Sequence, residues 1–139
     1  MNGKLILALS LFGLAMGVGT VFVIPSTVEP LFWLAIFVVC AAVIARKAAG
    51  RYFLHGFLVS MANCVWVTGA HVLLFTSYAA SHSKEMLMMA RMPLPDSPRL
   101  MMLLTGPVIG VASGILLGLF AFIASKLRRK GPALTRLGS

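Results

Sequence analysis

The sequence has very little charge, and almost none of it is negative. Only 11% of its 139 residues are charged and only three are acidic, whereas 60% are hydrophobic. A soluble domain carries about 25% charged residues, and one of this length has too small a core to bury so many apolar side chains. The scarcity of charge therefore excludes a water-soluble fold and predicts a chain that lies mostly in lipid.

The three acidic residues, Glu29, Glu85 and Asp96, all lie outside the long apolar runs. Transporters that couple to protons commonly carry a carboxylate within a membrane-spanning helix. The chain therefore lacks the usual carrier for proton-coupled transport.

Cysteine is scarce as well, because Cys40 and Cys64 stand alone in apolar runs and form no C-x-x-C pair. This disfavours disulfide exchange, and no nucleotide-binding, zinc or hydrolase motif is present. His55 and His71 are sixteen residues apart, about 24 Å along a helix, which is too far for both to ligate one haem. We therefore expect a protein that is not an enzyme and needs no cofactor.

What the sequence does contain is a set of four apolar runs, separated by charged residues or proline. A helix needs about 20 apolar residues to cross a hydrocarbon core of about 30 Å. The second run is short, but Arg46 and Lys47 can lay their stems along lipid and complete it. We predict an all-α integral membrane bundle of four transmembrane helices over residues 1–130, followed by a short disordered tail over 131–139. The predicted spans are about 5–24, 31–49, 52–80 and 98–125.

The twelve Lys and Arg residues are divided unequally between the two sides of such a bundle. Basic residues near helix ends favour the cytoplasmic side, so both termini are predicted to be cytoplasmic, in a cell inner membrane. The net charge of +9 then orients the helices, and we expect no nucleic-acid partner. Three basic residues fall on the outer side, namely Lys84, Arg91 and Arg99, and nine on the inner side, namely Lys4, Arg46, Lys47, Arg51, Lys126, Arg128, Arg129, Lys130 and Arg136.

A basic cluster follows the last span in the segment KLRRK. Each Lys or Arg next to a membrane adds about 1 kcal/mol of attraction to anionic lipid. The cluster therefore predicts contact with lipid headgroups through Lys126, Arg128, Arg129 and Lys130.

Polar residues gather on one face of the third span. Ser60, Asn63, Trp66 and His71 share this face on a helical wheel, and the opposite face is apolar. Polar side chains at membrane depth either bond to neighbouring helices or line a wet pathway or pocket. Both interpretations remain open for these four residues.

Glycine recurs every four residues in the last span, at Gly106, Gly110, Gly114 and Gly118. Small residues let helix backbones approach closely, which drives helix association in lipid. Gly13 and Gly17 give the first span a matching small face. We expect the first and last spans to pack on each other through these glycines, or the last span to form a homo-oligomer.

The outer loop before the last span is rich in methionine, with Met86, Met88 and Met89 close to His82. Thioether and imidazole ligands suit Cu(I), so a copper site is one interpretation. The other is an amphipathic helix over 83–92 that lies in the membrane interface with Met and Leu towards lipid.

The segment from Tyr78 through the KEM residues into TGPVIGVASGILLGLFAFIASKLRRK resembles a family of small bacterial inner-membrane proteins of unknown function. The resemblance implies four spans, a glycine-rich last helix and a basic cytoplasmic end. It supplies no catalytic residues. We expect a multi-pass accessory or binding component; the alternative is a small oligomeric transporter or channel that uses the polar face of the third span.

Overall fold

The structure, a computed structural model, describes residues 1–25, 27–91 and 96–135. Its elements are α1 (Gly3–Phe22), α2 (Glu29–Lys47), α3 (Tyr52–Leu73), α4 (Phe75–Ser81), α5 (Ser83–Ala90) and α6 (Pro98–Thr135). The described residues contain no strand. The expected all-α class is confirmed.

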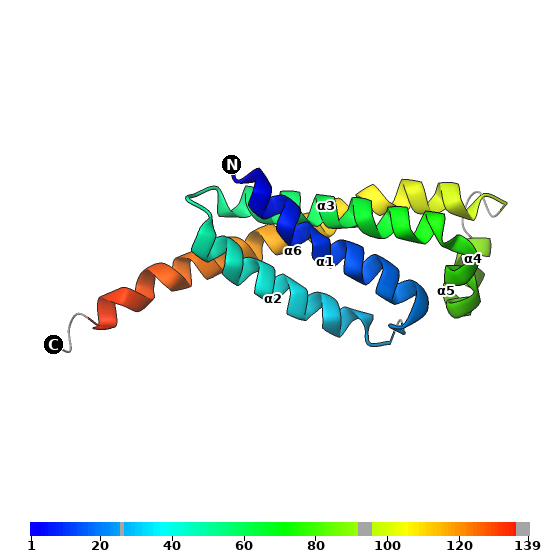
Figure 1. Ribbon diagram of the computed structural model, residues 1–139, viewed down its shortest axis with the longest axis horizontal. Helices are drawn as coiled ribbons and strands as arrows, with labels where there is room; N and C mark the ends of the chain where they lie inside the picture. The colour runs from blue at the N-terminus through cyan, green and yellow to red at the C-terminus, as the bar shows by residue number, and fades with distance from the viewer. Residues whose placement is uncertain (26, 92–95, 136–139) are drawn as a thin grey trace.

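Four of these helices are long and apolar enough to cross a membrane, namely Gly3–Phe22, Glu29–Lys47, Tyr52–Leu73 and Pro98–Arg129. Both chain termini, together with the turn between α2 and α3, lie at one end of the bundle (Figure 1). The turn between α1 and α2 lies at the other end, beside α4 and α5 (Figure 1). This arrangement supports a multi-pass membrane protein.

The helix ends follow local sequence signals. Asn2 caps α1 by accepting a hydrogen bond from the Leu5 amide at 3.1 Å, and Pro30 occupies the first turn of α2. The tight turn into α3 places Arg51 in the left-handed region, with φ of 51°. Pro98 begins α6, as the Ser97-Pro98 pair suggests.

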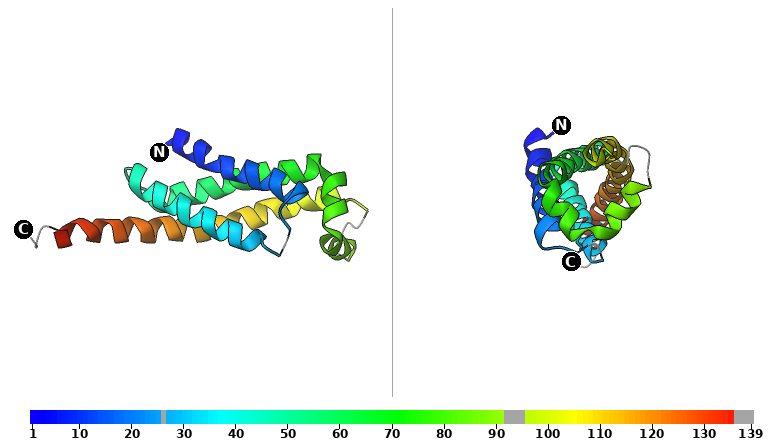
Figure 2. Two further views of the ribbon diagram at one scale, coloured as in Figure 1. Left: turned by 60° about the horizontal axis from the view of Figure 1, so that its bottom comes forward. Right: turned by 90° about the vertical axis from the view of Figure 1, so that its right-hand side faces the viewer.

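The third predicted span is wrong in its length. A continuous helix was expected over 52–80, but the chain turns at Leu74 and divides it into α3 and α4. The turn lays α4 across the end of the bundle, where Ser81 donates a hydrogen bond to the Val21 carbonyl at 3.0 Å (Figure 2). Burial of Tyr78 against Val21 and Met102 accompanies the same turn.

The last helix is longer than predicted. α6 continues to Thr135 and has 38 residues, about 57 Å at 1.5 Å per residue. It therefore extends past the other helices at the terminal end of the bundle (Figure 1). The expected disordered tail is helical up to Thr135, and residues 136–139 lie outside the described part of the chain.

Helix α3 packs between α1 and α6, and α2 packs on α6. The expected contact between the first and last spans is therefore wrong, because both of their glycine faces contact α3. α2 crosses α6 near the terminal end and diverges from it towards α4 and α5 (Figures 1 and 2).

A buried apolar cluster fills the terminal half of the bundle, which we call the packed half. Its members come from α1, α2, α3 and α6, with Ala48 just beyond α2: Leu5, Leu9, Phe37, Cys40, Ala41, Ile44, Ala48, Val59, Leu117 and Ala121. A smaller buried cluster at the other end of the bundle joins Val21 of α1, Tyr78 of α4 and Met102 of α6. The region between the two clusters contains the candidate site.

Candidate functional site

A cavity of about 680 Å³ lies where α2 diverges from α6. Three residues come from α2, six from α3 and eight from α6, while Tyr78 and Met89 belong to the capping helices α4 and α5. Ligand pockets typically have volumes of about 300–1,000 Å³. We call this cavity the α2–α6 pocket.

Most of the pocket lining is apolar or small, and a few polar groups converge on it. Phe37 closes one end of the pocket, since it also belongs to the cluster of the packed half. Ile109 and Leu116 line the pocket while remaining 63% and 48% exposed. The pocket is therefore open at the side of the bundle and closed towards the packed half.

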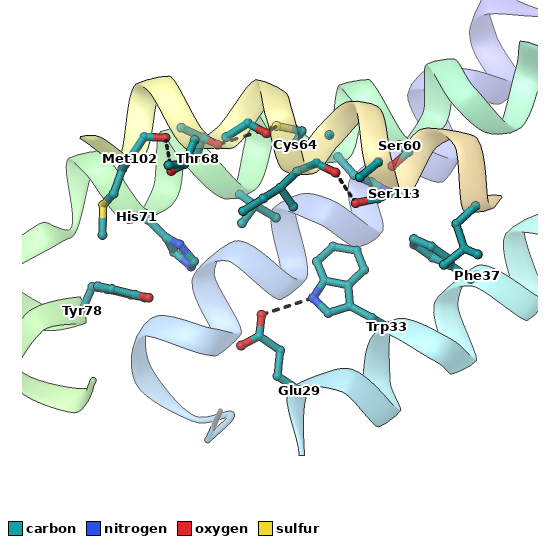
Figure 3. Close-up of a pocket in the computed structure, with 18 of the residues that line it drawn as sticks. Glu29, Trp33, Phe37, Ser60, Cys64, Thr68, His71, Tyr78, Met102 and Ser113 are labelled. Atoms are coloured by element: carbon teal, nitrogen blue, oxygen red, sulfur yellow. Dashed lines mark hydrogen bonds between the residues drawn. The ribbon is translucent and has the colours of Figure 1, made fainter. Parts of the chain in front are cut away.

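Glu29 and Trp33 form the α2 side of the pocket (Figure 3). The Trp33 indole N–H donates a hydrogen bond to Glu29 Oε1 at 3.2 Å, which fixes both side chains one turn apart. Glu29 is in the first turn of α2, where the positive end of the helix dipole favours a carboxylate. Glu29 is the one charged residue of the described pocket lining.

Tyr78 of α4 and His71 of α3 form the side of the pocket at the capped end of the bundle (Figure 3). Their rings lie 4.5 Å apart between centroids, and Tyr78 also stacks on His82 at 4.1 Å. Burial, followed by the negative charges of Glu85 and Glu29, raises the pKa of Tyr78 to about 12. Tyr78 therefore presents a neutral hydroxyl, which points into the pocket in Figure 3.

The four residues of the predicted polar face divide between two tasks. Ser60, Asn63 and His71 line the pocket. Trp66 instead donates a hydrogen bond to Ser10 Oγ of α1 at 3.1 Å and is not among the lining residues. Both interpretations left open for this face therefore apply, because Trp66 bonds to a neighbouring helix and the other three residues line a pocket.

Two of the pocket residues also bond to α1. Asn63 Oδ1 accepts a hydrogen bond from the Gly13 amide at 3.0 Å, and His71 Nε2 lies 2.8 Å from Thr20 Oγ1. Thr20 donates to the Gly17 carbonyl at 3.2 Å, so it accepts from the His71 ring. Asn63 Nδ2 is buried and has no hydrogen-bond partner in the described chain.

The predicted glycines pack against α3 rather than against each other. A Cβ at Gly106 would meet Thr68 Oγ1, at Gly110 it would lie 2.9 Å from Cys64 Cβ, and at Gly118 2.8 Å from Phe53. Gly114 likewise faces Phe57, while Gly13 and Gly17 face Asn63 and Ala70. The four predicted glycines of α6 are all buried, so α3 occupies the groove that a second copy would need.

The basic cluster is tied to the packed half of the bundle. Arg128 Nη1 donates to the carbonyls of Ala45 and Arg46 at 2.7 and 3.1 Å. Arg129 lies over the Tyr52 ring at 5.9 Å and Lys126 over the Phe122 ring at 5.2 Å. All three are exposed, and the side chain of Lys130 is outside the described part of the structure.

The candidate copper ligands do not share one face. His82 is buried with its Nδ1 3.0 Å from the Tyr78 carbonyl, and Met89 lines the pocket. Met88 is 61% exposed, and Met86 is half-buried. The segment forms the short helix α5 expected by the competing interpretation.

Sequence reasoning missed the α2 and α6 sides of this site. Glu29 was placed outside the apolar runs, and Trp33, Thr105 and Ser113 were not singled out. Their helical spacing could have placed Glu29 and Trp33 on one face, because they are four residues apart. Nothing in the sequence indicated that this face meets α6 across a cavity.

Comparison with known protein families, with curated proteins and with solved structures gives no match. The resemblance noted for the C-terminal third therefore stays an expectation, and function must be argued from the pocket itself.

Proposed function

We propose that this protein is a multi-pass membrane binding component that takes an amphipathic small molecule from the bilayer into the α2–α6 pocket. The observation that carries the proposal is the pocket itself, a cavity of about 680 Å³ with apolar walls and a few convergent polar groups. Exposed lining residues of α6 provide a side entrance from lipid.

The closed packed half supports binding over conduction. Ile44, Val59 and Leu117 are fully buried there, and they belong to one apolar cluster. A transporter or channel would need this cluster to open, whereas a binding protein needs only the pocket. The polar face of α3 also serves binding, since Ser60, Asn63 and His71 contribute to the pocket wall.

The setting that we propose is a bacterial inner membrane with both termini in the cytoplasm. The basic residues near the terminal end of the bundle support this orientation. Lys126, Arg128, Arg129 and Lys130 would then contact anionic headgroups of the inner leaflet. A cysteine introduced at exposed Ser83 of α5 should react with an impermeant maleimide from outside the cell; reaction only from inside would reverse the orientation.

Photolabelling tests the binding proposal. In proteoliposomes, a neutral long-chain alcohol that carries a diazirine should label pocket residues such as Thr68 and Thr105 in addition to lipid-facing residues. Ser113→Trp, which fills the pocket, should remove the pocket labels, whereas Ile115→Trp on the exposed side of α6 should leave them. Labelling confined to lipid-facing residues such as Val65 and Val108 would contradict the proposal.

A further inference from the structure

The charge in the α2–α6 pocket is opposite to the charge of the chain. The protein carries a net charge of +9, yet Glu29 is the single charged residue among the lining residues that the structure describes. The carboxylate is held at the pocket by the hydrogen bond from Trp33. Because Glu29 is half-buried beside mostly apolar walls, water screens its charge less than that of a fully exposed carboxylate, and the charge attracts a cationic occupant.

The hydroxyl groups of α6 strengthen this preference. Thr105 Oγ1 donates to the Met101 carbonyl at 2.9 Å, and Ser113 Oγ donates to the Ile109 carbonyl at 2.5 Å. A hydroxyl has one hydrogen and two lone pairs, so each group has spent its donor on its own helix. What Thr105 and Ser113 offer to the pocket is therefore acceptor oxygen, which favours a positively charged or hydrogen-bond-donating occupant.

Aromatic rings supply a third contribution of the same sign. Trp33 and Phe37 line the pocket from α2 (Figure 3), whereas the Tyr78 ring is already packed against the rings of His71 and His82. The faces of aromatic rings carry partial negative charge and attract organic cations, most strongly where water is excluded. The neighbouring basic residue Arg99 lies over Phe75 at 5.1 Å and does not line the pocket.

From these observations we infer that the occupant is a lipophilic organic cation, with a bulky apolar body in the α2–α6 pocket and its positive charge near Glu29. This inference rests on the proposed binding function and adds the chemical class of the ligand. The apolar walls select the body, and the carboxylate, the acceptor oxygens and the ring faces select the sign of its charge.

Two ions of the same shape and opposite charge test the inference. Tetraphenylphosphonium and tetraphenylborate should be measured by equilibrium dialysis against the full chain in a nonionic detergent. Binding in the pocket is defined as the saturable binding of each ion that is lost in the Ser113→Trp variant. This definition separates pocket binding from binding of the anion to the basic cluster. We expect tetraphenylphosphonium to bind the pocket at least tenfold more tightly than tetraphenylborate.

Charge-removing variants locate the preference. Glu29→Gln should weaken tetraphenylphosphonium binding at least tenfold and abolish the preference for the cation. Asp96→Asn removes the same charge from an exposed turn outside the pocket, so it should leave both affinities within twofold. Trp33→Leu, which keeps Glu29 but removes a ring face, should weaken cation binding several-fold and so tests the site independently if Glu29→Gln fails to fold.

The outcomes separate the inference from the proposed function. Equal pocket affinities for the two ions, tighter binding of the anion, or no effect of Glu29→Gln would overturn the preference for a cation. If neither ion occupies the pocket but the neutral diazirine probe labels it, the ligand class is wrong and the binding function stands. If the neutral probe also fails to enter, both are wrong.

Discussion

Gly56 lies where the backbones of α3 and α6 approach closely. A Cβ at this position would lie 2.7 Å from the Leu117 carbonyl oxygen and 2.8 Å from the Gly118 Cα. Backbone atoms cannot move aside as a flexible side chain can, so only glycine allows this approach. Close backbone contact is a main source of helix association in lipid. Gly69 lies on the same helix, and no atom would lie within 4 Å of its Cβ.

These two glycines form a matched pair for substitution. Gly56→Ala should destabilise the bundle by about 1–3 kcal/mol, because α3 and α6 must separate to accept the methyl group. Gly69→Ala should be neutral or stabilise by up to about 1 kcal/mol, because alanine is the better helix former. Thermal unfolding in detergent measures both. Equal effects of the two substitutions would contradict the packing of α3 on α6.

At the scale of the helix, α2 ends under the basic cluster of α6. The last carbonyl groups of a helix have no hydrogen-bond partner within that helix. Arg128 Nη1 donates hydrogen bonds to two of these carbonyls in α2, those of Ala45 and Arg46. Arg128 therefore joins α2 to α6 in the packed half, on the opposite side of the crossing from the pocket.

Removal of this link should loosen the end of α2. Arg128→Gln should lower stability by about 1 kcal/mol, the usual net value of a hydrogen bond, and speed hydrogen exchange in the last turn of α2. Arg129→Gln is the matched control, because Arg129 lies over the Tyr52 ring and is not bonded to α2. Equal exchange in the two variants would show that charge alone, and not the hydrogen bonds, stabilises this end.

The sequence predicted where the helices lie far better than which helices pack on each other. Apolar length determines how many helices can cross a membrane, and all four long helices start within two residues of the predicted positions. The turn at Leu74 could not be predicted, because no proline or glycine marks it within an apolar run. Glycine spacing identified faces that pack closely, but a small face fits any other helix equally well, so α3 was not recognised as the common partner.

At the scale of the whole molecule, the bundle has one packed half and one hollow half. The divergence of α2 from α6 opens the pocket, and the apolar cluster around Ile44 and Leu117 closes the rest. This division could not be predicted from the sequence, since all four spans are long apolar helices and their apolar length does not show where α2 crosses α6. The pocket residues Ser60, Asn63 and His71 were found from polarity alone, whereas Glu29 required the fold.

The two native cysteines test this division directly, because they occupy the two halves. Cys64 lines the pocket, whereas Cys40 is 0% exposed in the packed half. The unmodified protein in liposomes is treated with N-ethylmaleimide, which crosses membranes, and the modified residue is identified by mass spectrometry. We predict that Cys64 is modified in the folded protein and that Cys40 reacts only after denaturation. Modification of Cys40 as fast as Cys64, or protection of both, would contradict a pocket confined to one half of the bundle.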